Sequence, residues 1–260
     1  MGDTQSPLRV ERIKDVLIWH IHDPDSLNAL GPKLLAFLES ALQELEKVSE
    51  SGIPPRVVGV YVTSVATKSG QKVFMAGGHL KELATLSEEE AHDFFRRTRL
   101  LRHRMQTLPQ PFVCFIDGIA IGGGAEFALF CDYRLGSPEA KFYFKQLEIG
   151  LPCGFIGTKG LCHLIGIARV QQLLFGKKLI SGKKSLQMGL VHRLMKTSLS
   201  PERFARWLQR NFAGLELSAL VATKQSMYGS QDALGEEREL ISFMKCWRNE
   251  THAAVLERFK

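Results

Sequence analysis

Three consecutive glycines, Gly122 to Gly124, stand two residues before a carboxylate, Glu126. Apolar segments flank them on both sides, so the pattern predicts a strand, a glycine-rich turn and the start of a helix. The first backbone N–H groups of a helix have no partner inside it and can hold negative charge. We therefore expect exposed amides that stabilise a carbonyl oxygen as it gains charge during a reaction. The structural alternative is a tight turn that packs a helix against a strand.

Spacing excludes two phosphate-binding patterns. Three residues separate Gly118 from Gly122, so the segment does not supply G-x-G-x-x-G. The segment GKKLISGKKS, residues 176–185, has five residues between its glycines instead of four, and Lys184 stands where Ser or Thr is required. No His, Cys, Asp and Glu cluster has metal-ligand spacing, so no metal is expected.

The hydrophobic pattern predicts the elements that position these residues. Runs of β-branched and apolar residues predict strands, two of them around a turn at Lys14 and others over residues 56–64 and 112–116. Helices are expected to start at Pro32, at a capping box formed by Ser87 and Glu90, at Ala125 and at Pro201. Strand and helix alternate, which predicts an α/β fold.

The composition limits the class of protein. The 260 residues are 45% hydrophobic, and no segment approaches the ~18–20 apolar residues of a membrane span. The start of the chain lacks the apolar core of a signal peptide, so we expect a soluble, cytoplasmic protein with no membrane partner. A net charge of +7 favours anionic partners. Residues 94–105 form the densest basic cluster, but their apolar spacing predicts a solvated helix face and no nucleic-acid site.

Four ordered motifs carry a resemblance to a known family. They are DPDSLNAL at 23–30, FMAGGHLKEL at 74–83, PQPFVCFIDGIAIGGGAEFALFCD at 109–132 and AKFYFKQLEIGL at 140–151. In this order they resemble the crotonase superfamily, also called the enoyl-CoA hydratase/isomerase family. The resemblance spans roughly residues 8–200, and it is specific because four motifs occur in register.

The resemblance implies a spiral of ββα units with a helical C-terminal region. It divides the chain into a spiral core at 1–200 and a helical trimerisation region at 201–260. The implied assembly is a homotrimer or hexamer. The implied substrate is an acyl-CoA thioester, so coenzyme A is part of the substrate and no separate cofactor is expected.

The same resemblance assigns site residues by position. The N–H groups of Gly78 and Gly123 correspond to the oxyanion hole, where one such donor is typically worth ~3–4 kcal/mol. Glu126 corresponds to the first catalytic glutamate and would act as a general base. Gln146 stands where the family has its second catalytic glutamate. If residues 142–148 are extended, Glu148 lies on the same side as Gln146, about 6–7 Å along the strand, and is a candidate substitute.

The missing second glutamate directs the predicted reaction. Hydration by the family's route uses two carboxylates on one water, and an amide cannot exchange a proton. Isomerisation needs one carboxylate, and decarboxylation needs none to start, so both are favoured over hydration. The region from the glycines onward is similar to ethylmalonyl-CoA decarboxylase, although CGFIGT at 153–158 departs from the usual glycine-rich pattern and predicts an altered acyl pocket. The alternative is a catalytically inactive acyl-CoA-binding or scaffold protein, and RNA binding is a more distant third.

Further residues are assigned to substrate or coenzyme A contacts. His79 follows the first oxyanion-hole residue and would donate to a substrate carboxylate or supply a proton, unless it is a local structural partner. Lys81 stands where family members approach the coenzyme A phosphates, with a solvated lysine as the alternative. Ala76, Leu30 and Phe259 complete the expected contacts.

Overall fold

The protein is described from a computed structural model, which covers residues 6–51, 53–212, 215, 217–228, 244, 247, 253–254 and 256–259. The strands are β1 Leu8–Ile13, β2 Val16–Ile21, β3 Val57–Val62, β4 Val65–Ala66, β5 Lys72–Met75, β6 Phe112–Ile116, β7 Ile119–Ile121, β8 Tyr133–Gly136, β9 Lys141–Tyr143, β10 Ile180–Ser181 and β11 Arg193–Leu194. The α-helices are α1 Pro32–Ser51, α2 Leu80–Ala84, α3 Glu88–Thr107, α4 Gly123–Ala128, α5 Gly157–Ile165, α6 Ile167–Phe175, α7 Gly182–Met188, α8 Pro201–Phe212 and α9 Leu217–Tyr228. Two 3-10 turns are η1 Gln146–Ile149 and η2 Glu257–Phe259.

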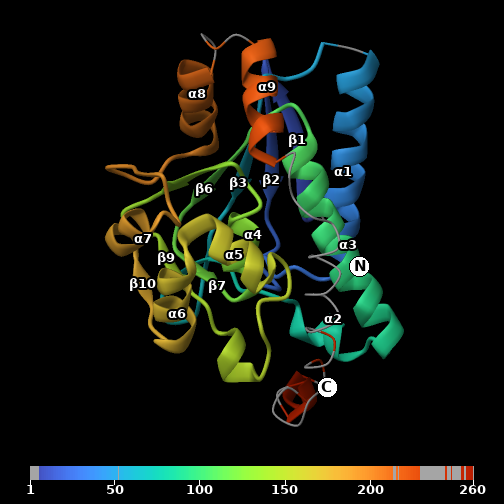
Figure 1. Ribbon diagram of the computed structural model, residues 1–260, viewed down its shortest axis with the longest axis vertical. Helices are drawn as coiled ribbons and strands as arrows, with labels where there is room; N and C mark the ends of the chain where they lie inside the picture. Colours follow the sequence, from blue (N-terminus) through green and yellow to red (C-terminus); the bar gives the residue numbers. More distant parts are fainter. Residues whose placement is uncertain are drawn as a thin grey trace.

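Two sheets lie at the centre of the molecule, and successive units of the chain contribute to both. One sheet has the order β1-β2-β3-β6-β8-β11 and the other has the order β10-β9-β7-β5-β4. β1 and β2 both join the first sheet before α1, whereas later units add a strand to each sheet before a helical segment, as in β3-β5-α3 and β6-β7-α4. The predicted spiral of ββα units is therefore confirmed (Figure 1).

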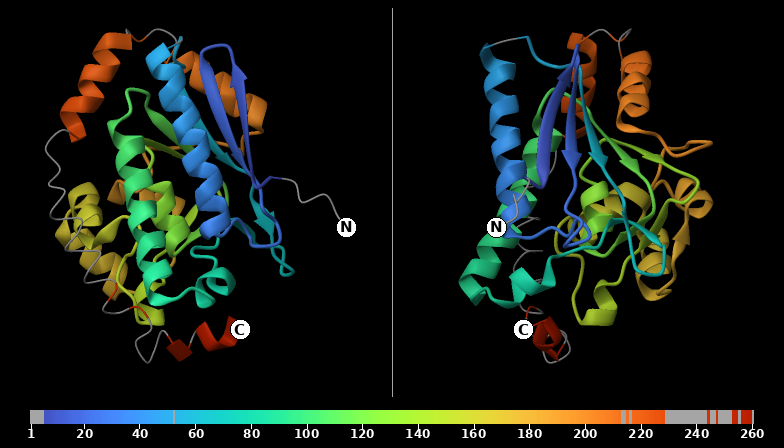
Figure 2. Two further views of the ribbon diagram at one scale, coloured as in Figure 1. Left: turned by 90° about the vertical axis from the view of Figure 1, so that its right-hand side faces the viewer. Right: turned by 180° about the vertical axis from the view of Figure 1, so that it is seen from behind.

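The six-stranded sheet is covered on both faces. α1 and α3 lie side by side on one face, and α8 lies on the other (Figure 2). Side chains alternate along β3, so that Val58 and Val60 join the larger core while Val57 and Tyr61 pack with α8 residues such as Phe204. Because β3 is buried on both faces, its residues are apolar without interruption, and this explains the apolar run predicted as a strand over residues 56–64.

Most predicted elements are present. The two strands around Lys14 form the antiparallel pair β1-β2, and Lys14 has a φ of 57° at the turn. The capping box of Ser87 and Glu90 is formed at the start of α3. α1 and α8 begin at the predicted prolines, and α4 begins at Gly123, two residues before the predicted start. The proposed trimerisation region contains α8 and α9, and its residues 229–243 lie outside the described part of the chain.

One stated condition is not met and one expectation is wrong. Residues 142–148 are not extended, as the placement of Glu148 beside Gln146 required, because β9 ends at Tyr143 and η1 follows, closed by Gly150 with a φ of 77°. The basic face of α3 is only partly solvated, because Arg99 and Arg102 are 5% and 4% exposed. No helix among the described residues is long and apolar enough to cross a membrane.

Candidate active site

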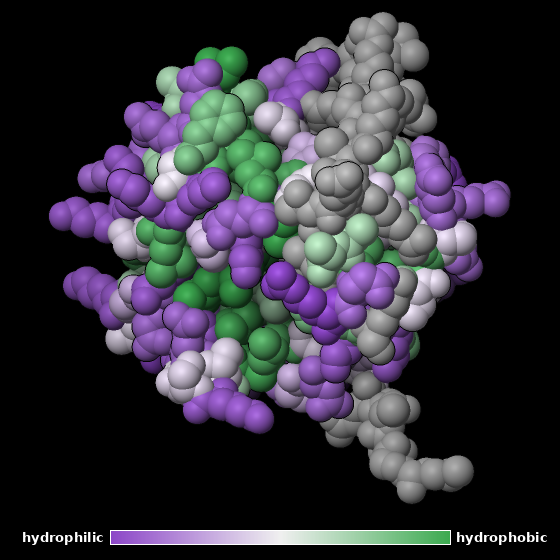
Figure 3. All heavy atoms as spheres, turned by 90° about the horizontal axis from the view of Figure 1, so that it is seen from below, coloured by the Kyte–Doolittle hydropathy of each residue, from purple (hydrophilic) through white to green (hydrophobic). Residues whose placement is uncertain are grey.

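A cavity of about 470 Å³ opens where the glycine triplet meets β5 and η1. Of the residues predicted from the sequence, it is lined by Ala76, Gly78, Gly123, Glu126, Gln146, Glu148 and Phe259. Its other walls are mainly apolar and come from α2, the segment 149–155 and the described C-terminal residues. In the view from below, hydrophobic atoms form a band between hydrophilic side chains (Figure 3).

The two amides predicted to bind the oxyanion both border this cavity. Gly123 is the first residue of α4, and its N–H therefore has no partner inside the helix. Neither the Gly78 N–H nor the Gly123 N–H donates a hydrogen bond to another described residue. The two segments are in contact, because a Cβ on Gly77 would lie 3.3 Å from Gly123 N. Two free donors on one cavity wall are the arrangement that an oxyanion hole requires.

Close approach explains why the triplet consists of glycines. Gly122 has a φ of 51°, a backbone angle that residues with a side chain rarely adopt. A Cβ on Gly123 would overlap the ring of Phe155, and a Cβ on Gly124 would overlap the carbonyl oxygen of Met75 on β5. The glycines therefore allow α4 to pack closely against β5, which was the structural alternative. They also leave the Gly123 N–H at the cavity, as the functional interpretation expects.

Glu126 lies in the first turn of α4, and its residue is only 2% exposed. Its Oε1 accepts hydrogen bonds from Gln146 Nε2 at 2.7 Å and from Gly154 N–H at 3.3 Å. Its Oε2 accepts from the N–H groups of Phe155 and Ile156 at 2.9 Å and 2.8 Å. Burial raises the pKa of Glu126, while these four donors oppose the rise. Because a carboxylate offers about four acceptor sites, all of them are occupied.

Residues 154–156, whose N–H groups bind Glu126, also accept hydrogen bonds through two of their carbonyl oxygens. Arg99 donates from Nε to the carbonyl oxygen of Gly154 at 2.9 Å, and Arg102 donates from Nη1 to that of Ile156 at 3.1 Å. Both guanidinium groups come from α3 and are buried. These contacts could not be predicted from the sequence, because the partners are backbone atoms, which any residue type supplies.

Gln146 and Glu148 have different environments, since both lie on η1 and not on an extended strand. Gln146 is 6% exposed and binds Glu126 directly. Glu148 lines the same cavity, but its Oε1 accepts a hydrogen bond from the Tyr143 hydroxyl at 2.7 Å. This contact with Glu148 raises the pKa of Tyr143. Within the described part of the chain, an amide and no second carboxylate is in contact with Glu126.

The remaining predicted contacts divide into two groups. Ala76 and Phe259 line the cavity, whereas Leu30 is fully buried and pairs with Gly78 as a β-bridge. His79 does not line the cavity, because its ring caps α2 and Nδ1 accepts from the Glu82 N–H at 3.2 Å. This geometry favours the structural interpretation of His79.

Lys81 is exposed on α2 and lies outside the cavity lining. Its proposed contact with the coenzyme A phosphates therefore stays a prediction. Within the described residues, no group of three or more His, Cys, Asp and Glu side chains is arranged to hold a metal ion.

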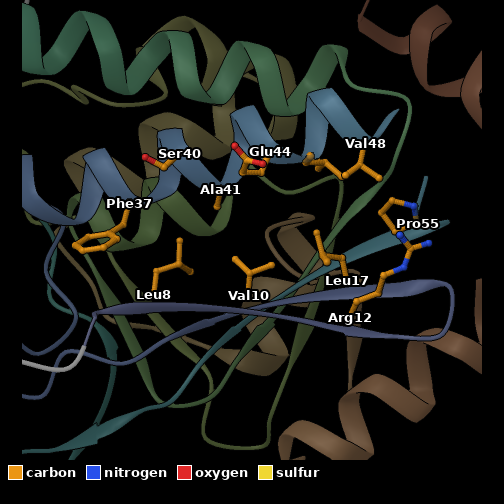
Figure 4. A pocket seen from close by; sticks show the side chains of 11 residues that line it. Leu8, Val10, Arg12, Leu17, Phe37, Ser40, Ala41, Glu44, Val48 and Pro55 are labelled. Atoms are coloured by element: carbon orange, nitrogen blue, oxygen red, sulfur yellow. The ribbon is translucent and has the colours of Figure 1, made fainter. Parts of the chain in front are cut away.

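A second cavity of about 450 Å³ contains none of the predicted site residues. It lies between α1 and the β1-β2 pair, with Leu8, Val10 and Leu17 facing Phe37 and Val48 (Figure 4). This cavity is mostly apolar and contains neither Glu126 nor the glycines of the expected oxyanion hole, so the chemistry expected from the sequence belongs to the first cavity.

Comparisons with known proteins show the family and the fold. The sequence model of the family described as enoyl-CoA hydratase/isomerase matches residues 11–244. The chain is 30% identical over 189 residues to the short-chain-enoyl-CoA hydratase of Clostridium acetobutylicum, covering 73% of this chain and 69% of that protein. It is 30% identical over 217 residues to a probable enoyl-CoA hydratase of Bacillus subtilis, covering 83% and 80%. The crystal structure of an enoyl-CoA hydratase from Bacillus halodurans has the same fold, with a TM-score of 0.84 at 20% identity over 97% of this chain and 100% of that one.

Proposed function

Because the chain belongs to the enoyl-CoA hydratase/isomerase family, we propose that its cavity binds an acyl-CoA thioester and stabilises the enolate formed from it. The thioester oxygen would lie between the N–H groups of Gly78 and Gly123, which are both unoccupied donors on the cavity wall. Donors that are already in place stabilise developing charge without reorganisation, and this accounts for a large part of many rate enhancements.

We further propose that the reaction is isomerisation or decarboxylation rather than hydration. The observation that carries this proposal is the 2.7 Å hydrogen bond from Gln146 Nε2 to Glu126 Oε1. A neutral amide occupies the position next to the carboxylate, and it cannot deliver a proton to carbon. In isomerisation one carboxylate moves a proton between two carbons, whereas in decarboxylation the loss of carbon dioxide itself generates the enolate.

The test is to incubate the protein separately with crotonyl-CoA, a 3-enoyl-CoA and ethylmalonyl-CoA. Mass spectrometry distinguishes water gain from carbon dioxide loss, and chromatography resolves the isobaric isomers. We expect turnover of the second or third thioester and no hydration of the first. Rapid hydration of crotonyl-CoA would contradict the proposal.

Two variants separate the roles of the cavity acids. Gln146→Glu places a second carboxylate against Glu126, and we expect it to add water to crotonyl-CoA. Glu148→Gln tests whether Glu148 supplies a proton in place of the missing glutamate. If hydration by the parent protein is lost in Glu148→Gln, then Glu148 is the substitute acid and the one-carboxylate proposal is wrong.

A second candidate is a catalytically inactive acyl-CoA-binding or scaffold protein. One observation favours it: all four acceptor sites of Glu126 are occupied by N–H donors in this structure. Retention of a buried carboxylate in the binding cavity argues against it. Calorimetric binding of a saturated acyl-CoA, combined with no turnover of any of the three thioesters, would select this candidate.

The assembly and location are also proposals. We propose a homotrimer or hexamer in the cytoplasm, supported by the family resemblance over the core. Analytical ultracentrifugation of the full chain measures its mass, and a monomer at micromolar concentration would contradict this proposal.

A further inference from the structure

The carboxylate of Glu126 cannot accept a proton in the arrangement that the structure shows. Each of its two oxygens receives two N–H donors at 2.7–3.3 Å. A carboxylate has about four acceptor sites, so no lone pair is left for a proton from a substrate carbon. At least one donor must leave before Glu126 acts as a base.

Three of the four donors are backbone groups that are fixed in place. They belong to residues 154–156, where Phe155 and Ile156 are 3% and 2% exposed. Buried Arg99 and Arg102 bind the carbonyl oxygens of the same segment. Moving these N–H groups would therefore break the arginine contacts as well, and it would displace the Phe155 ring from Gly123.

The fourth donor, the Gln146 amide, is held much more weakly. Its Nε2 donates to Glu126 Oε1, and its own Oε1 has no hydrogen-bond partner among the described residues. The amide therefore forms one side-chain hydrogen bond, and rotation about its side-chain torsions breaks only that bond. Gln146 also lines the cavity, where a bound acyl group would be in contact with it.

We propose that Gln146 is a positioning residue that holds Glu126 in place and must leave its Oε1 before that oxygen accepts a proton. This inference rests on the proposed function, and it identifies Oε1, not Oε2, as the oxygen that exchanges protons. In the exchange step the substrate Cα–H bond breaks, its electron pair forms the enolate, and the proton moves to Glu126 Oε1. Return of that proton to another carbon completes an isomerisation.

The first test compares the parent protein with Gln146→Leu, which has a side chain of similar size and no donor. We incubate each with butyryl-CoA in deuterium oxide and follow α-proton exchange by NMR from pH 4 to 9. Because the competing hydrogen bond to a charged group is absent, we expect kcat for exchange to rise about tenfold with little change in KM. The acid limb of the pH profile should move to higher pH, since the Gln146 amide lowers the pKa of Glu126.

Gln110→Leu is the matched control. Gln110 is a fully buried glutamine outside the cavity, and its Nε2 donates to the Ser49 hydroxyl at 2.9 Å. We expect the acid limb of the pH profile for α-proton exchange to be the same in Gln110→Leu as in the parent protein. A fall in kcat for Gln146→Leu with an unmoved acid limb would overturn the proposal, because Gln146 would then act on the substrate itself or only support the fold.

A second measurement does not depend on turnover. Difference infrared spectroscopy follows the protonated carboxyl band of Glu126, assigned as the band absent from Glu126→Gln. We expect a higher pKa of Glu126 in Gln146→Leu than in the parent protein, and an equal or lower pKa would overturn the proposal. If the pKa rises but neither protein exchanges α-protons, Gln146 does position Glu126 and it is the proposed proton abstraction that fails.

Discussion

Replacement of Glu126 by glutamine should destabilise this protein, although the two side chains have nearly the same shape. The introduced amide has one acceptor oxygen in place of two. Placed at the Oε2 position, that oxygen keeps the Phe155 and Ile156 donors, and the Gln146 amide can turn to accept from the new NH2 group. The Gly154 N–H then faces another donor and loses its acceptor.

The magnitude follows from this one lost acceptor. A buried N–H without an acceptor costs about 1–3 kcal/mol. For a chain of this size, each kcal/mol lowers Tm by roughly 2–4 °C, so we expect Glu126→Gln to lower Tm by about 2–12 °C. Differential scanning calorimetry of the ligand-free protein at pH 7 measures the change.

Glu148→Gln is the matched control for stability. Glu148 lines the same cavity, but its partner is the Tyr143 hydroxyl, and a carbonyl oxygen still accepts that hydrogen bond, so no buried donor loses its acceptor. We expect a change within about 0.5 kcal/mol. A Glu126→Gln variant as stable as the parent protein would contradict the predicted loss of stability, because the Gly154 N–H would then not depend on the carboxylate as its acceptor.

Three further outcomes test other parts of the structure. Gly123→Ala should lose about 1–3 kcal/mol by overlap with the Phe155 ring, and a double-mutant cycle with Phe155→Leu should recover part of the loss in thermal unfolding. Lys224→Met should lose about 3–5 kcal/mol in urea unfolding, because Lys224 Nζ lies 2.8 Å from Asp132 Oδ2 and donates to the carbonyl oxygens of Met105 and Gln110, so the change removes the ion pair and both hydrogen bonds. Partial burial lowers the pKa of His192 from 6.5 to about 4. The unfolded chain therefore binds more protons than the folded chain between these pH values, so the free energy of unfolding should rise with pH across this window. In urea titrations, the free energy of unfolding of His192→Gln should rise less over the same window.

The sequence predicts the framework well because its signals are local. Apolar runs, prolines at helix starts and the Ser87–Glu90 capping box depend on neighbouring residues, and the corresponding elements form where expected. The two glycines of the expected oxyanion hole also border one cavity, because both follow strands of the same sheet.

The environment of Glu126 could not be predicted, because it depends on long-range contacts with backbone atoms. Its partners lie 20 to 30 residues away in sequence, and three of them are N–H groups that any residue other than proline supplies. The same limit applies to Arg99 and Arg102, whose spacing indicated a solvated face. They are buried because carbonyl oxygens of residues 154–156 accept their hydrogen bonds.

The condition that residues 142–148 are extended fails for a related reason. β9 pairs with β7 over just three residues. Beyond Tyr143 the chain turns into η1, and this turn brings Gln146 to Glu126. Glu148 is thereby separated from Glu126 and binds Tyr143 instead.

A crystal structure of the protein with acetoacetyl-CoA tests the proposed oxyanion hole most directly. We expect the thioester oxygen to lie about 2.7–3.1 Å from both the Gly78 and the Gly123 nitrogen atoms. We also expect the acyl group to lie beside Glu126 Oε1 in the cavity lined by Gln146. A thioester oxygen bound away from these two amides, or an acyl-CoA bound outside this cavity, would contradict the proposal.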